Sequence, residues 1–253
     1  MHTGFHSRYL PHDRDIVVYL PPGYGDSPEH RYPVLYLHDG QNLFDPETAF
    51  LGQEWRADET ADALIFSGEI EPLIMVGIYN TGENRINEYT PTGIASGHQG
   101  GKACLYAAMI VDELKPFIDS EYRTLDGPEN TGMGGSSLGG LVTLYIGLSH
   151  PETFGKLAAI SPSIWWDRRA ILRIAREAPI PEPRPRIWLD IGTAEGNHPG
   201  RIVRDARLMR NLLLRKGWQA GLDLAYFEDP GAWHSESAWA ARLPGVLRFL
   251  FGK

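Results

Sequence analysis

The segment Gly134-Gly135-Ser136-Ser137-Leu138-Gly139-Gly140, near the middle of the chain, contains the pattern Gly-x-Ser-x-Gly with Ser137 at its centre. A serine on a tight turn between a strand and a helix has a strained backbone and crowded neighbours, so only glycine fits two positions before it and two positions after it. The turn exposes the hydroxyl at the N-terminus of the helix, whose positive end faces developing negative charge. The segment therefore predicts that Ser137 is a nucleophile, although a glycine-rich turn with an N-capping serine could have the same five residues.

Short apolar runs and helical patterns alternate on both sides of this segment. We expect strands at residues 15–20, 32–37, 72–79, 156–160, 186–191 and 221–227. We expect helices at residues 54–66, at about 102–122, from a glycine-dense turn at 132–140 through residue 150, and at 167–177, 201–216 and 235–251, the last interrupted near Pro244. Because strands that alternate with helices form parallel crossovers, the pattern predicts an α/β fold with a mostly parallel sheet and helices on both faces.

The length and composition fit one globular domain. The 253 residues can bury a sizeable core, and we expect a single domain over residues 1–253. The 42% of hydrophobic and 22% of charged residues argue against a disordered or fibrous chain. A net charge of -8 without a run of Lys or Arg argues against nucleic acid as a partner. The oligomeric state stays open.

The sequence also limits the compartment and the cofactors. No apolar run approaches the roughly 20 residues that span a bilayer, so we expect no membrane segment. Residues 1–8 contain no basic stretch followed by an apolar one, so we expect no signal peptide and take the cytoplasm as the default location. Cys104 is the sole cysteine, which excludes an internal disulfide and a zinc site with several thiolates.

A serine hydroxyl needs a base that removes its proton, so the pattern around Ser137 calls for a histidine. Only His198 and His234 follow Ser137 beyond the adjacent helix. His234 lies in the loop between the last expected strand and the last expected helix, where a base can reach the edge of the sheet. We therefore predict His234 as the general base and His198 as a solvated loop residue.

The base in turn needs a carboxylate that orients it, and with a serine on this kind of turn the acid lies between the serine and the histidine in the chain. Glu195 follows the expected strand 186–191, and open α/β sheets keep functional groups at the carboxyl ends of their strands. Asp190 lies inside that strand, and Asp229 lies in the loop before the histidine. We predict Glu195 as the acid, with Asp229 and Asp190 as alternatives.

Two backbone N–H groups should face the oxyanion that forms when the serine attacks a carbonyl. One belongs to the residue after the nucleophile, Leu138. The other should come from the loop after the early strand, where the sequence reads His38-Asp39-Gly40-Gln41. We predict Leu138 and Gln41 as the two donors, and an ordinary loop residue is the alternative for Gln41.

Five stretches together resemble the putative-esterase group of α/β hydrolases, which includes esterase D, enterochelin esterases, feruloyl and acetylxylan esterases and mycobacterial mycolyltransferases. These stretches are residues 36–45, 134–140, 161–166, 192–196 and 233–235, and the resemblance covers nearly the whole chain. It implies an α/β-hydrolase fold without a separate lid domain, and it supports Ser137, Glu195 and His234 as a triad, with an oxyanion donor at Gln41. The mycolyltransferase branch also uses glutamate as the acid.

Other polar, aromatic and sulfur-containing residues also have expected roles. Trp165 and Trp166 follow a strand, so we expect at least one to line the acyl or alcohol pocket, with packing in the core as the alternative. In the polar loop after another strand, Arg85 and Glu88 are expected to form an ion pair that braces the loop. Cys104 is expected to be a small buried residue on a helix.

These residues predict a serine esterase for short-chain or aromatic carboxylic esters. Ser137 would attack the ester carbonyl, His234 would take and return the proton, and Glu195 would orient the imidazole. The reaction needs no metal and no organic cofactor. An acyltransferase would use the same acyl-enzyme with another acceptor, and a serine peptidase could use the same turn. A non-catalytic binding protein on this fold would have no reason to retain all three residues.

Overall fold

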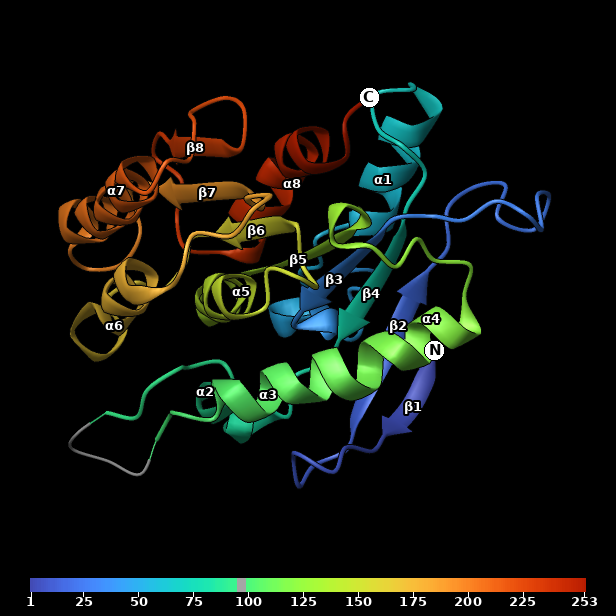
Figure 1. Cartoon of the computed structure of the whole chain (residues 1–253), viewed down its shortest axis with the longest axis horizontal. Helices are drawn as coiled ribbons and strands as arrows, with labels where there is room; N and C mark the ends of the chain where they lie inside the picture. Colours follow the sequence, from blue (N-terminus) through green and yellow to red (C-terminus); the bar gives the residue numbers. More distant parts are fainter. Residues whose placement is uncertain (95–98) are drawn as a thin grey trace.

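The computed structural model describes residues 1–94 and 99–253, and these residues form one eight-stranded sheet (Figure 1). The strands are β1 (His2–Phe5), β2 (Arg14–Tyr19), β3 (Val34–His38), β4 (Ile74–Ile78), β5 (Thr131–Ser136), β6 (Lys156–Ile160), β7 (Arg186–Gly192) and β8 (Leu224–Asp229). Their order across the sheet is β1-β2-β4-β3-β5-β6-β7-β8. The β1–β2 and β2–β4 pairs are antiparallel, and the pairs from β4 to β8 are parallel.

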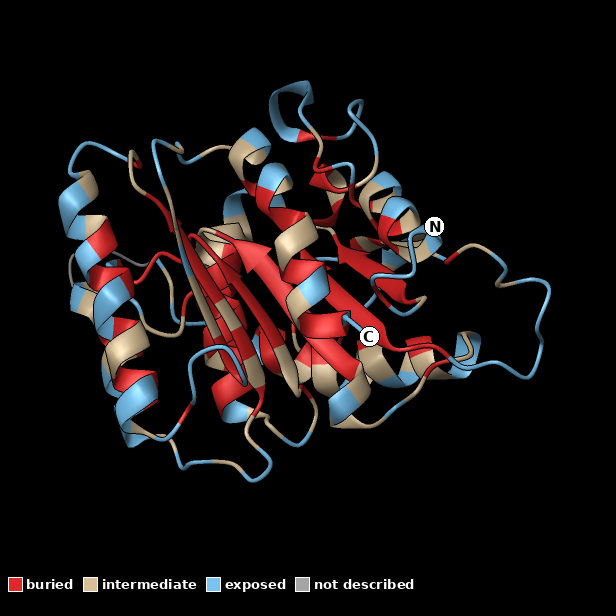
Figure 2. Cartoon of the chain, turned by 90° about the horizontal axis from the view of Figure 1, so that it is seen from above, coloured by how far each residue is buried: buried red, intermediate tan, exposed pale blue. Residues whose placement is uncertain are grey.

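Helices cover both faces of this sheet (Figures 1 and 2). They are α1 (Ala57–Phe66), α2 (Arg85–Glu88), α3 (Ala103–Met109), α4 (Lys115–Glu121), α5 (Leu138–Ser149), α6 (Trp166–Glu177), α7 (Pro199–Arg215) and α8 (Glu236–Phe251). Apolar side chains of α1 and α8 form one core layer with the sheet, and those of α3, α5, α6 and α7 form the other. The expected α/β class, with a mostly parallel sheet between two helical layers, is confirmed. None of the helices in the described ranges is long and apolar enough to cross a membrane.

The glycine-rich strand β5 is the main difference from the expected elements. We expected a turn over residues 132–140, but the chain stays extended from Thr131 to Ser136. The reason is close packing, since a Cβ atom on Gly134 would lie only 2.7 Å from the Cβ of Ala158 on the neighbouring strand β6. The glycines thus let β5 pack centrally in the sheet, and the turn itself is confined to Ser137.

Three other boundaries differ from the sequence-based expectation. The short strand β1 was not expected. The predicted helix at about 102–122 is α3 and α4 joined through a wider π-helical turn, Ile110–Leu114. The predicted interruption at Pro244 is wrong, because α8 runs through it to Phe251. Leu243 and Val246, on either side of this proline, are fully buried, so packing against the sheet offsets the missing backbone donor.

Candidate active site

Ser137 sits on the turn between β5 and α5 in a strained conformation. Its φ is 58° and its ψ is -119°, and its N–H donates to the carbonyl oxygen of Ile160 at 3.0 Å. A Cβ atom on Gly135 would lie 3.1 Å from the Cβ of His38 and 3.2 Å from the backbone of Gly139, so glycine is needed at this crowded corner. The strand, turn and helix expected around Ser137 are therefore present, and the hydroxyl lies at the N-terminus of α5.

Three predicted residues from three loops form one chain of hydrogen bonds. The Oγ of Ser137 lies 2.9 Å from the Nε2 of His234, and the Nδ1 of His234 lies 2.7 Å from the Oε2 of Glu195. Glu195 follows β7 and His234 follows β8, so the parallel strands bring all three to their shared carboxyl-terminal edge. The arrangement can pass a proton from the serine to an imidazole whose other nitrogen is held by a carboxylate.

The other candidates for base and acid lie apart from this chain of hydrogen bonds. His198 is exposed at the start of α7, as expected. Asp190 accepts hydrogen bonds from the backbone N–H of Ser161 at 2.9 Å and from the indole of Trp188 at 2.7 Å. Asp229 ends β8, and its carboxylate lies 3.8 Å from the guanidinium of Arg242.

Buried groups that the sequence did not reveal hold Glu195 in place. Its Oε1 accepts hydrogen bonds from the backbone N–H of Gly192 at 2.8 Å and from the hydroxyl of Ser161. Arg242 of α8 donates to that hydroxyl at 2.9 Å and lies 3.1 Å from a carboxylate oxygen of Asp190. Burial raises the pKa of Asp190 to about 6, although Arg242 opposes this shift. The buried guanidinium of Arg242 therefore lies close to two buried carboxylates, those of Asp190 and Glu195, and partly balances their charge.

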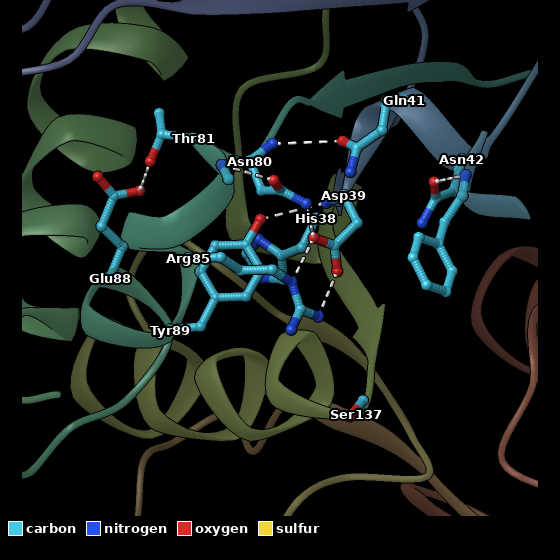
Figure 3. A network of polar contacts seen from close by, with 12 residues as sticks. His38, Asp39, Gln41, Asn42, Asn80, Thr81, Arg85, Glu88, Tyr89 and Ser137 are labelled. Atoms are coloured by element: carbon cyan, nitrogen blue, oxygen red, sulfur yellow. Dashed lines mark hydrogen bonds and ion pairs between the residues drawn. The ribbon is translucent and has the colours of Figure 1, made fainter. Parts of the chain in front are cut away.

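A second network holds the loop after β3 (Figure 3). Asp39 has a left-handed backbone with φ 58°, and its carboxylate accepts two hydrogen bonds of 2.7 Å from Arg85 and one of 2.7 Å from the side chain of Asn80. Burial disfavours the charged carboxylate, but Arg85 and Asn80 outweigh burial and hold the pKa of Asp39 below its usual value. The expected pair between Arg85 and Glu88 is wrong. Glu88 instead binds the buried Arg14 of β2 through hydrogen bonds of 3.0 and 3.2 Å.

The two predicted oxyanion donors belong to different elements. Leu138 is the first residue of α5, and Gln41 lies in a short 3-10 helix, η1 (Gly40–Asn42), directly after Asp39. The side-chain oxygen of Gln41 accepts a hydrogen bond from the backbone N–H of Asn80 at 3.3 Å. A Cβ atom on Gly40 would lie 2.4 Å from the backbone of Gly77, so glycine lets this loop pack directly on β4.

A cavity of about 430 Å³ opens above Ser137 and His234. Its polar lining includes Asp39, Gln41, Asn42, Gln53, Asn80, Arg85, Ser136, Ser235 and Glu236, and its apolar lining consists of Phe50, Leu51 and Trp239. Most of these residues could not be predicted from the sequence, because they come from segments that only the fold brings together. Within residues 1–94 and 99–253, no three His, Cys, Asp or Glu side chains are grouped to hold a metal ion.

Trp165 and Trp166 are not among the residues that line this cavity. Trp166 is buried, and its indole N–H donates to the carbonyl oxygen of Thr92 at 2.8 Å. Trp165 is half exposed at the protein surface. Cys104 is exposed on α3, so the expectation that it is buried is wrong. A single cysteine in a helical pattern does not show which face of the helix it occupies.

Comparisons with known proteins identify a family and several relatives that this chain resembles. The profile of a family described as putative esterase matches residues 7–250. The chain is 28% identical to the uncharacterized protein YbbA of Bacillus subtilis, a match that covers 99% of this chain and 97% of that protein. It is 27% identical to an endo-1,4-beta-xylanase/feruloyl esterase of Xylanibacter ruminicola, over 92% of this chain and 29% of that protein.

The solved structures include an enterobactin esterase from Shigella flexneri, FES, determined in the presence of enterobactin. It superimposes with a TM-score of 0.76 at 22% identity, over 96% of this chain and 56% of that one. At this identity the likeness concerns the fold, and it confirms the expected α/β-hydrolase fold.

Proposed function

The chain belongs to the putative esterase family, and we propose that it hydrolyses carboxylic esters through an acyl-enzyme on Ser137. The observation that carries the proposal is the continuous chain of hydrogen bonds from the Ser137 hydroxyl through His234 to the buried carboxylate of Glu195. Nucleophile, acid and base follow one another in the chain as Ser137, Glu195 and His234, the order that is typical of hydrolases with a serine on this turn.

The reaction starts when the Oγ of Ser137 attacks the ester carbonyl carbon while the Nε2 of His234 takes the hydroxyl proton. The carbonyl oxygen becomes an oxyanion, which the backbone N–H groups of Gln41 and Leu138 bind. The carboxylate of Glu195 stabilises the imidazolium and keeps its Nε2 directed at the serine. The bond to the alcohol oxygen then breaks, and His234 gives its proton to the leaving alcohol.

Water completes the cycle by the same steps in reverse. His234 removes a proton from water, which attacks the carbonyl carbon of the acyl-enzyme, and the bond to the Oγ of Ser137 breaks. The acid is released, and the serine recovers its proton from the imidazolium. The residues of this chain suffice for every step.

The cavity supports short-chain or aromatic esters as substrates. Its volume of about 430 Å³ is at the lower end of the range for small-molecule sites, and Phe50, Leu51 and Trp239 supply an apolar wall for an acyl chain or ring. The enzyme named feruloyl esterase among the similar proteins is in keeping with an aromatic acyl group.

The proposal is tested with nitrophenyl esters of increasing acyl length and with methyl ferulate. Wild-type protein should hydrolyse the shorter or aromatic members, and Ser137→Ala should abolish turnover while circular dichroism shows an intact fold, because only one hydroxyl is removed. Residual activity above about a thousandth of the wild-type rate would exclude Ser137 as the nucleophile.

A further inference from the structure

Glu236 is a partly buried titratable group of the cavity that the proposed reaction does not use. It is the first residue of α8 and lines the cavity two positions after His234. The indole N–H of Trp55 donates to its Oε2, and the side-chain amide of Asn42 donates to its Oε1 at 3.2 Å. These two donors come from different segments and hold the carboxyl in one place.

The charges that line the cavity leave Glu236 without a cationic partner. Arg85, the arginine of the lining, gives two hydrogen bonds to Asp39, so the charges of that pair cancel. Among the described residues, Glu236 forms no ion pair with a lysine or an arginine. A partly buried carboxylate without a counter-ion is unfavourable, and a cation from a ligand would remove this penalty.

The position of Glu236 relates it to the alcohol part of an ester. The leaving oxygen must lie within reach of the Nε2 of His234, because this nitrogen protonates it. Glu236 follows His234 at the start of α8, and its partner Asn42 follows Gln41, whose N–H faces the oxyanion in the proposed mechanism. Glu236, His234 and Ser137 line the same cavity, so an alcohol part whose oxygen lies at the Nε2 of His234 can extend to this carboxyl.

We propose that Glu236 binds an ammonium group in the alcohol part of the ester substrate, an inference that rests on the proposed esterase function. The aromatic side chains of Phe50 and Trp239 line the same cavity, and aromatic rings attract organic cations. The preferred substrates are therefore esters of cationic amino alcohols.

The preference for a cationic ester over a neutral ester should depend on pH, because Glu236 binds the cation only when its carboxyl is ionised. Burial raises the pKa of Glu236 to about 7, while the indole of Trp55 opposes the shift. Of the charged groups around it, Asp39 raises this pKa, and Arg85 and His234 lower it. The carboxyl is thus largely neutral at pH 6 and largely charged at pH 8, so the preference for a cationic ester increases over this interval.

The test compares acetylcholine with 3,3-dimethylbutyl acetate, its neutral analogue of the same shape, by release of acetate. Wild-type protein should have the higher kcat/KM for the cationic ester at pH 8, and the ratio of the two values should fall toward pH 6. Glu236→Gln should lower the ratio at pH 8 by about tenfold, the scale of one ion pair in a partly buried site. The ratio cancels any general damage that the substitution does to the site.

Glu47→Gln is the matched control, because Glu47 is an exposed carboxylate in the segment between Asn42 and Phe50 and does not line the cavity. It should leave the ratio unchanged, since an exposed charge is screened by solvent. An unchanged ratio in Glu236→Gln, an equal fall in the control, or hydrolysis of the neutral ester alone would overturn the inference. Failure of the proposed function has a different signature, namely turnover of both esters that survives Ser137→Ala.

Discussion

The two flanks of Ser137 each contain an arginine and a buried aspartate, but they differ in exposure and in charge balance. On the β7–β8 flank, Arg242 is only 4% exposed and serves the two buried carboxylates of Asp190 and Glu195. On the β3–β4 flank, the side chain of Arg85 is 26% exposed, lines the cavity and binds the carboxylate of Asp39 one to one. The first flank therefore has an excess of acidic groups, and the second is balanced.

This difference matches the two tasks of the proposed mechanism. The β7–β8 flank holds the base, and an excess of carboxylate there stabilises the imidazolium that forms when Ser137 loses its proton. The β3–β4 flank holds a backbone donor, so a neutral pair that fixes the loop through Asp39 is sufficient. The comparison predicts that changes on the first flank affect proton transfer and stability, whereas changes on the second flank have smaller effects.

The largest effect is expected on removal of the base. His234→Ala should lower kcat/KM for nitrophenyl acetate by about ten thousandfold or more, because the Ser137 hydroxyl loses its proton acceptor. Ser137→Ala and the double variant should reach the same low rate, since the two residues act as one unit. Losses that multiply in the double variant would show that the residues act independently.

Replacement of the acid should have the next largest effect. Glu195→Gln should lower kcat by about a thousandfold with little change in KM, because the amide keeps the shape but removes the charge that stabilises the imidazolium. Asp229→Asn is the control on the same flank, and we expect it to change kcat by less than about threefold. The reverse order of these two losses would move the role of acid to Asp229.

Replacing each of the two arginines in turn compares the stability of the two flanks directly. Arg242→Met leaves two buried carboxylates without their cation and should lower the free energy of unfolding by about 3 to 5 kcal/mol. Arg85→Met removes a partly exposed partner and should lower it by about 1 to 2 kcal/mol. Urea denaturation of both variants at pH 7 measures the difference. Equal losses would contradict the distinction between the flanks.

A further expected effect concerns the pH dependence of stability. Because the folded protein raises the pKa of Asp190 from 3.8 to about 6, it binds this proton more tightly than the unfolded chain does. The stabilisation from this proton is lost as the pH rises through that interval. Relative to Asp190→Asn, wild-type protein should therefore lose about 2 kcal/mol of unfolding free energy between pH 4 and pH 7. A constant difference between the two proteins over this range would show that Asp190 has no raised pKa.

The parts of the site that the sequence predicted depend on local geometry. The turn at Ser137 needs glycines at fixed positions, and chain order directed attention to His234 and to acids before it. Chain order did not separate Glu195 from Asp190, because both lie near the end of the same strand. The structure distinguishes them, since only the carboxylate of Glu195 reaches His234, at 2.7 Å.

The parts that the sequence did not predict depend on pairs that are far apart in the chain. In the sequence, Arg242 cannot be distinguished from an arginine on the exposed face of a helix. In the structure, α8 packs it against Asp190, which precedes it by 52 positions. Arg85 was assigned to a neighbour in the chain, whereas its partner is Asp39 in another loop. The glycines of β5 suggested a turn, because the neighbouring strand that requires small residues is not visible in the sequence.

Covalent labelling tests the central claim, nucleophilic attack by Ser137, most directly. Wild-type protein treated with a fluorophosphonate should gain one phosphonyl group, with loss of fluoride and of the hydroxyl proton. Peptide mapping should locate this group on Ser137, with Ser136 and Ser163 unlabelled although both lie close by. His234→Ala should react far more slowly, because the hydroxyl lacks its base. Labelling of Ser136 or Ser163, or undiminished labelling of Ser137→Ala, would contradict the account.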